Sequence, residues 1–176
     1  MRDIVLRDGG KTERLTLPFP GCVLHGHDRS YTIWAVKRRP RNANAPLYRF
    51  PAPNVHTSGA ICAGGATFPR ASIATMDAAL DTFFTSAFND HLAGAVIHGG
   101  KLFDLWRALH EQRALDAKRA LDAKRTLDAN GQKRVNTQTG QEPAQLPTSK
   151  RKHGKPKAQR FPTDRLIPIG RLKEIL

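Results

Sequence analysis

The chain has 176 residues, of which 39% are hydrophobic, so it can bury one modest core and leaves part of its length outside that core. Its net charge of +14 lies mainly in the second part, because residues 1–112 carry 13 Lys/Arg against 9 Asp/Glu, whereas residues 113–176 carry 16 against 6. Two cysteines exclude a disulfide framework, and no apolar run is long enough for a membrane span or a secretory signal, so we expect a soluble, cytoplasmic protein without membrane contact.

The hydrophobic pattern of the first part of the chain predicts an antiparallel meander. Short turns separate four segments whose apolar residues alternate with polar ones or occupy both faces, namely residues 15–20, 22–25, 31–36 and 47–50. Tyr31 to Val36 is apolar on both faces, so we expect this strand inside the sheet. Pro51 and Pro53 lack backbone donors, and they end the sheet.

Two helices are predicted to cover this sheet. Residues 75–88 carry one apolar stripe at helical spacing, made by Met76, Ala79, Leu80, Phe83, Phe84 and Ala87. Residues 102–109 place their apolar side chains on one side in the same way. Strands, an irregular segment and covering helices in this order predict an α+β domain over residues 1–112.

A six-residue repeat follows this domain. Residues 113–130 contain three units in which Leu-Asp-Ala recurs, with high helix propensity. Six residues turn a helix by about 600°, so successive leucines lie about 240° apart and form no single stripe. We therefore predict a solvated helical extension that stops near Asn130-Gly131.

The remaining chain is polar and basic before it regains apolar residues. Residues 131–163 are rich in Gln, Thr, Pro and Lys, which predicts a disordered linker. Its cationic cluster consists of Lys150, Arg151, Lys152, Lys155 and Lys157. These charges either contact phosphates without sequence preference or are simply solvated. Residues 164–176 form a short apolar segment that docks either on the domain or on a partner.

A turn-rich segment leads to one of the cysteines. Asn54 precedes Cys62 by eight residues, and Gly59 lies between them. Small residues follow the thiol, from Ala63 to Ala66, and leave room for a partner's backbone. Cys62 is therefore a candidate nucleophile, and the alternative is a buried structural thiol.

This segment resembles the active-site signature of ubiquitin-conjugating enzymes, in which His-Pro-Asn precedes Gly-x-Ile-Cys by the same interval. With the runs at residues 45–55 and 83–88, it is similar to the PRTRC system protein B family, also described as prokaryotic ubiquitin-conjugating-enzyme-like family D. The resemblance spans roughly residues 15–110 and implies a ubiquitin-conjugating-enzyme-like fold.

The resemblance also implies a function. Cys62 would form a thioester with the C-terminus of a ubiquitin-like protein and then pass it to an amine, without metal or cofactor. Asn54 would hold the turn or donate to the developing oxyanion. The implied partners are a ubiquitin-like protein, a ThiF-like adenylating enzyme and a JAB-type peptidase, encoded in a bacterial plasmid or mobile-element cassette.

Several alternatives stay open. Ala52 replaces the signature's His and Ala63 its Leu, so a degenerate fold that binds a ubiquitin-like partner without chemistry is a second hypothesis. A third is a non-catalytic scaffold whose basic tail binds DNA. His56 is either a supporting base or a solvent-facing turn residue. If Asn54 does not take part in the chemistry, its role is that of a turn cap.

Two further features of the sequence concern acceptor activation and metal binding. No acidic residue closely follows Cys62 to activate an acceptor amine, and the nearest candidates are Asp77, Asp81 and Asp90. Cys22, His25 and His27 have the spacing of a metal cluster but lack a fourth ligand, so we expect a core cysteine beside surface histidines and no metal.

Overall fold

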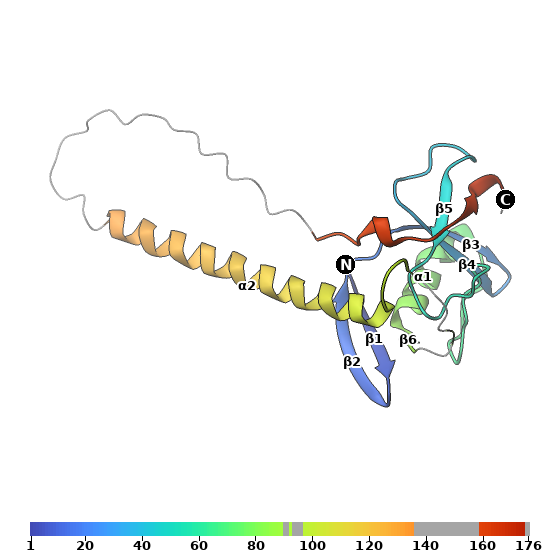
Figure 1. Cartoon of the computed structure of the whole chain (residues 1–176), viewed down its shortest axis with the longest axis horizontal. Coiled ribbons are helices and arrows are strands. Elements are labelled where there is room, and N and C mark those ends of the chain that lie inside the picture. The colour runs from blue at the N-terminus through green and yellow to red at the C-terminus, as the bar shows by residue number, and fades with distance from the viewer. Residues whose placement is uncertain (90–91, 93–96, 136–158, 175–176) are drawn as a thin grey trace. The chain divides into compact units, whose positions relative to one another are not determined.

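A computed structural model describes residues 1–89, 92, 97–135 and 159–174, with side chains except at 128–135 (Figure 1). The chain divides into two compact units, described here separately. The first unit comprises Met1–His110 and Arg160–Leu176, and the second comprises Glu111–Gln159. No helix among the described residues is both long and apolar enough to cross a bilayer.

The first sheet is built on an N-terminal hairpin. Strands β1 (Arg2–Asp8) and β2 (Lys11–Leu17) are antiparallel, and β6 (Ala87–Phe88) pairs in parallel with β1. Gly9 and Gly10 join β1 to β2 with φ angles of 53° and 79°, which a two-residue hairpin turn of this hand requires. We did not predict β1, because charged residues flank its short apolar run at both ends.

The second sheet has the strand order β3-β4-β5-β7. It contains β3 (Gly21–His27), β4 (Ser30–Val36), β5 (Pro46–Arg49) and β7 (Pro168–Arg171), all antiparallel. The predicted α+β class with antiparallel strands is confirmed, but the predicted meander is divided between two sheets. Pro18 and Pro20 separate β2 from β3, because neither has a backbone N–H for a ladder.

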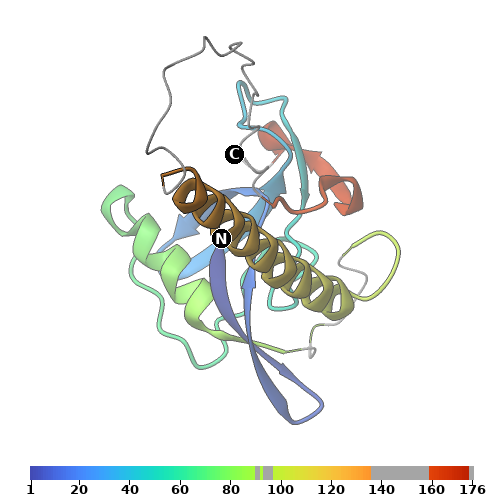
Figure 2. The same cartoon turned by 90° about the vertical axis from the view of Figure 1, so that its left-hand side faces the viewer.

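The covering helix ends earlier than its apolar stripe suggested. A 3-10 turn (Ile73–Thr75) leads into α1 (Met76–Thr85), which contacts β1 (Figure 2). Ser86 is extended, with φ −67° and ψ 149°, and its hydroxyl donates to the carbonyl of Phe83. Ala87 therefore belongs to β6 and not to the predicted helix over residues 75–88.

Aromatic side chains from both helices, from β6 and from the segments that follow β2 and β5 form the centre of the core of the first unit. They are Phe19, Phe50, Phe83, Phe84, Phe88 and Trp106, whose neighbouring ring centroids lie 4.9–6.3 Å apart. Tilted and edge-to-face pairs of this kind stabilise a core beyond their burial, by about 0.5–1.5 kcal/mol each. The wider hydrophobic core around these rings holds the two sheets together, because β1, β2, β4 and α1 all bury residues in it.

Helix α2 (Leu102–Val135) begins in the first unit and continues through the repeat. In the first unit Trp106 is fully buried, and the Nδ1 of His110 accepts the backbone N–H of Thr16 at 3.0 Å. Within the second unit the three leucines of the repeat are exposed, with values of 51% for Leu115, 49% for Leu121 and 63% for Leu127. This exposure agrees with their spacing of about 240° around the helix axis, which forms no apolar stripe. The helix ends at Val135, beyond the expected stop at Asn130-Gly131, and residues 136–158 of the predicted linker lie outside the described residues.

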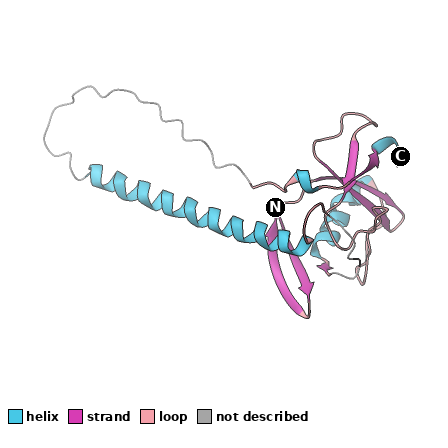
Figure 3. Ribbon diagram, viewed as in Figure 1, coloured by secondary structure: helices cyan, strands magenta, loops and turns pink. Residues whose placement is uncertain are grey.

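The C-terminal segment docks on the first unit. Strand β7, magenta in Figure 3, pairs with the edge of β5, and the backbone N–H of Arg49 donates to the carbonyl of Ile167 at 2.8 Å. Phe161 and Leu166 are buried in the aromatic core. Of the two alternatives for residues 164–176, the structure shows docking on the domain.

Replacing Leu166 with Ala tests this docking. Leu166 is 1% exposed, so the cavity left by the truncation should lower the free energy of unfolding by about 2–5 kcal/mol in urea titrations. Ile169→Ala is the matched control, because Ile169 is in the same segment but 40% exposed, and it should change stability by less than about 1 kcal/mol. Equal small effects of both substitutions would contradict the docking.

A charge network joins α2 to the N-terminal hairpin. The guanidinium of Arg107 donates to Asp8 at 2.7 Å and to both carboxylate oxygens of Glu13 at 2.6–3.2 Å. These hydrogen bonds lower the pKa of Glu13 and raise that of Arg107. All three side chains are about one-third exposed, and they surround a shallow hollow at the hairpin turn.

The lowered pKa of Glu13 predicts a pH dependence. Because its folded-state pKa is below the ordinary value of about 4.3, the contact stabilises the fold above that pH, and the stabilisation is lost as the pH falls through the folded-state pKa. Glu13→Gln should therefore lose less unfolding free energy than the wild type between neutral and acidic pH. Urea titrations across this range measure it, with Glu111→Gln, an exposed glutamate outside the network, as control. Identical pH dependence in wild type and Glu13→Gln would contradict the assignment.

Candidate functional site

The segment from Asn54 to Cys62 is a β-hairpin. The backbone N–H of Cys62 donates to the carbonyl of Asn54 at 2.8 Å, and that of His56 donates to Ala60 at 2.9 Å. Val55 and Ile61 form the bridge between these two bonds. The eight-residue interval in the sequence is therefore the register of a hairpin, and it places the backbones of Asn54 and Cys62 opposite each other.

Two tight turns shape this hairpin. The backbone N–H of Val55 donates to the carbonyl of Ala52 at 3.3 Å, which makes a β-turn with Pro53 at the position that its fixed φ favours. At the tip, Gly59 donates its N–H to His56 at 2.9 Å and has a φ of 83°. A three-residue hairpin loop commonly needs such a left-handed residue at its last position.

The hairpin extends the second sheet. Ile33 donates its N–H to the carbonyl of Gly59 at 2.8 Å, and Ile61 donates to Tyr31 at 2.9 Å. Strand β4 thus pairs with the hairpin along its first half and with β5 along its second half, where Trp34 and Ala35 have their partners. Cys62 directly follows the last residue of this pairing.

The side chain of Asn54 attaches the hairpin to the chain after α1. It is 5% exposed, and its Nδ2 donates to the carbonyl of Ala87 at 3.0 Å. Its Oδ1 accepts the backbone N–H of Asn89 at 3.4 Å. Asn54 therefore holds the turn in place by contacts with a segment more than thirty residues away.

Cys62 is half-buried, and the chain that follows it is open to solvent. Ala63, Gly64 and Gly65 are exposed, and a Cβ atom added at either glycine would meet nothing within 4 Å. The N–H of Ala66 donates to the carbonyl of Ala63 at 2.8 Å, so these residues form a turn of small side chains beside the thiol. A second polypeptide backbone has room to approach here.

The other cysteine has a different environment. Cys22 lies on β3 against the core, and burial raises the pKa of its thiol. Burial therefore favours its neutral form, whereas the thiolate is the nucleophilic form. Neither Cys22 nor Cys62 forms a disulfide.

The structure places the remaining candidate residues as follows. His56 is exposed at the tip of the hairpin. Ala52, which replaces the signature's His, is fully buried in the core, so an imidazole would not fit there without displacing its neighbours. Asp77 and Asp81 are exposed on α1, where Asp81 pairs with Arg2 at 2.7 Å.

The candidate metal cluster and the remaining charged groups differ in what the structure describes. His25 and His27 are exposed on β3, and Cys22 packs on the core. Among the described residues, no three His, Cys, Asp or Glu side chains gather closely enough to hold a metal ion. Asp90 and the cationic cluster from Lys150 to Lys157 lie outside the described residues.

An α+β fold in which an asparagine-led hairpin delivers a cysteine ahead of a covering helix defines a ubiquitin-conjugating-enzyme-like protein. A family model described as prokaryotic E2 family D matches residues 1–125, and the chain belongs to this family. No curated protein and no solved structure matches the chain.

Sequence reasoning missed two supports of the hairpin. Nothing in the sequence around Ala87 and Asn89 indicates that they hold Asn54, because the contact joins distant segments. The packing of Gly59 against Trp34 was also missed, although a glycine at a hairpin tip does indicate a left-handed conformation.

Gly59→Ala tests this geometry. A Cβ atom there would lie 2.6 Å from the Nε1 of Trp34, and an alanine at a φ of 83° is strained by about 1–2 kcal/mol. We expect lower stability and faster hydrogen exchange at the amides of Ile33 and Ile61. Gly65→Ala is the control, because Gly65 has open space around it and should leave both amides protected. Unchanged exchange in Gly59→Ala would contradict the observed pairing.

Proposed function

We propose that this protein is a ubiquitin-conjugating-like carrier that forms a thioester on Cys62. The observation that carries the proposal is the placement of Cys62, which a backbone-bonded hairpin holds half-exposed beside an open turn of small residues. Membership in prokaryotic E2 family D supports the same assignment. Thiolates suit a carrier because they are good nucleophiles near neutral pH and good leaving groups afterwards.

The chemistry consists of two acyl transfers. In the first, the Cys62 thiolate attacks the activated C-terminal carbonyl carbon of a ubiquitin-like protein; a C–S bond forms and the activating group leaves. In the second, an amine attacks the same carbon; a C–N bond forms, the Cys62 thiolate leaves, and the amine's proton passes to a base or to solvent. No cofactor takes part in either step.

Asn54 positions Cys62 in this proposal. Its amide is held by Ala87 and Asn89, so it stabilises the hairpin from which the thiol projects. In this proposal Asn54 also donates to the developing oxyanion, through the second hydrogen of the Nδ2 group whose first is bound to the carbonyl of Ala87. His56 is exposed on the same hairpin and is the nearest residue by sequence that can accept a proton.

The proposed partners follow from the resemblance to the PRTRC system protein B family. A ThiF-like enzyme would adenylate the ubiquitin-like protein, Cys62 would receive it, and a JAB-type peptidase would remove or process it. Their genes would lie together in a bacterial plasmid or mobile-element cassette.

Charging with purified components tests the proposal. The protein is incubated with the cassette's adenylating enzyme, ubiquitin-like protein and ATP, and adducts are separated with and without a reducing thiol. We expect a thiol-labile adduct in the wild type and none in Cys62→Ala. Cys62→Ser should instead give an oxyester that resists thiols and is cleaved by hydroxide, because its side-chain oxygen replaces the sulfur.

Cys22→Ala is the matched control, because it removes the other thiol of the chain and should charge like the wild type. An adduct that persists in Cys62→Ala would place the chemistry elsewhere. Absence of any wild-type adduct, while the adenylating enzyme itself becomes charged, would favour the degenerate fold that binds without chemistry.

A further inference from the structure

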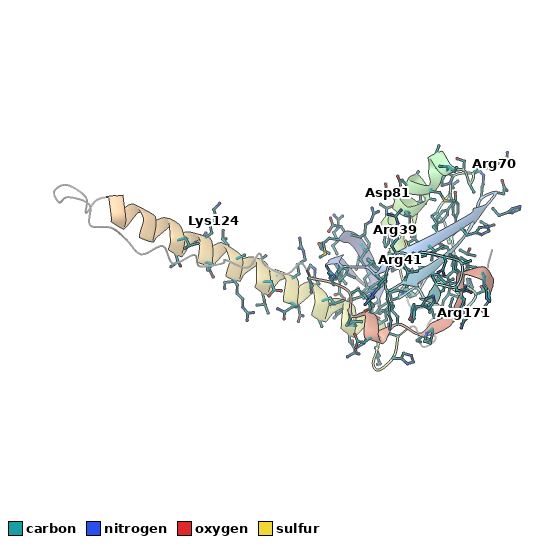
Figure 4. The ribbon with its side chains drawn as sticks, turned by 90° about the horizontal axis from the view of Figure 1, so that it is seen from above. Arg39, Arg41, Arg70, Asp81, Lys124 and Arg171 are labelled. Carbon is teal, nitrogen blue, oxygen red and sulfur yellow. The ribbon has the colours of Figure 1, made fainter. Side chains whose placement is uncertain are left out.

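The fold assembles a cationic patch from two segments that are far apart in the sequence. Its six exposed members are Lys37, Arg38, Arg39, Arg41, Arg171 and Lys173. The first four lie in the connection between β4 and β5, and the last two lie at and just after β7. Figure 4 labels Arg39, Arg41 and Arg171.

Backbone hydrogen bonds hold the two segments together. The N–H of Lys173 donates to the carbonyl of Ala43 at 2.6 Å, and the N–H of Leu172 donates to Ala45 at 3.0 Å. Pro46 and Arg171 are direct partners in the β5–β7 ladder. The patch therefore belongs to the folded first unit, and it is separate from the cationic cluster from Lys150 to Lys157.

The charges of the patch are not neutralised within the described part of the chain. None of its six cations lies within ion-pair distance of a described carboxylate, whereas Arg2, Arg70 and Arg107 all have acidic partners. No Asp or Glu occurs in the sequence between Asp28 and Asp77. Glu174 lies beside the patch, and its carboxylate accepts the backbone N–H of Arg171 at 3.0 Å.

The side chains of the patch fit phosphate groups. Four of the six are arginines, whose planar guanidinium donates two parallel hydrogen bonds to phosphate oxygens. Like charges repel each other over a Debye length of about 8 Å at physiological salt, and three of these cations are consecutive in the sequence. A bound polyanion would relieve this repulsion. Binding would also release the counterions condensed on the polyanion, and this release is the main source of the affinity of cationic proteins for the DNA backbone.

The patch offers little for the alternative partner, an acidic protein surface. Protein interfaces are centred on an apolar core with aromatic anchors. Ile169 is the one large apolar side chain of these two segments that is exposed, and Tyr48 is half-buried beneath the ammonium group of Lys37 at 4.7 Å. For the same reason, no exposed aromatic ring in these segments is available to stack on bases.

We propose that this patch binds the phosphate backbone of double-stranded DNA without sequence preference. The binding is independent of Cys62, so it neither requires nor excludes the carrier function. It adds to the protein an affinity for DNA that resides in the folded unit itself and does not depend on the basic tail.

Fluorescence anisotropy with a labelled mixed-sequence DNA duplex tests the proposal over a range of salt concentrations. The test variant of the full chain replaces Arg38, Arg39 and Arg41 with Gln. Its control replaces three other exposed arginines of the first unit, Arg7, Arg14 and Arg29, and has the same net charge. We expect the test variant to bind more weakly than the control and to lower the slope of log K against log salt by about 2–3.

A third variant distinguishes the contribution of the patch to DNA affinity from that of the tail. It replaces the five cations of the Lys150–Lys157 cluster with Gln. The patch substitutions should weaken binding in this background too. The proposal is overturned if the test variant and the control bind DNA equally, or if only the tail variant loses affinity. It is also overturned if the patch substitutions weaken binding to polyglutamate but not to DNA, because the partner would then be an acidic protein. Circular dichroism of every variant checks that the fold is retained.

Discussion

The pairing of residues 59–61 with the first half of β4 is the interaction on which the site depends. Strand β5 pairs only with the second half of β4, and the hairpin that begins at Asn54 occupies the free half. This pairing uses backbone groups, so it does not depend on which side chains flank the cysteine. The pairing that places Cys62 is therefore formed with alanine at positions 52 and 63.

The hairpin is held from outside the sheet as well. The carboxamide of Asn54 binds the chain at Ala87 and Asn89, and these residues follow α1 directly. Helix α1 in turn places Phe83 and Phe84 in the aromatic core beneath both sheets. Asn54 therefore links the hairpin that carries the thiol to the chain that directly follows α1.

The second half of the chain completes the first unit at two places. The beginning of α2 buries Trp106 in the core and pairs Arg107 with the N-terminal hairpin. The C-terminal segment covers the open edge of β5 with β7, so that β7 becomes the edge strand of this sheet. The same pairing brings Arg171 and Lys173 beside the loop after β4, so one contact adds a strand to the sheet and assembles the cationic patch.

Local patterns in the sequence accounted for much of this protein. The strand predicted at residues 31–36 and the helix predicted at 75–88 both exist, because side-chain periodicity is a local property, although the helix ends at Thr85. The interval between Asn54 and Cys62 indicated the family, which the family match confirms, and the nucleophilic role of Cys62 stays a prediction. The sequence did not indicate β1, β6 or β7, since short or charged segments become strands only when another strand offers hydrogen-bond partners.

By itself, the sequence determined the α+β class, the helical repeat and the turn chemistry that leads to Cys62. Only the tertiary structure decided that the predicted strands divide between two sheets, that Asn54 is held by the chain after α1, and that the C-terminal segment docks on β5. The physical reason is sequence separation. Turns and helices depend on neighbours a few residues away, whereas these contacts join segments whose proximity is set by burial of one shared core.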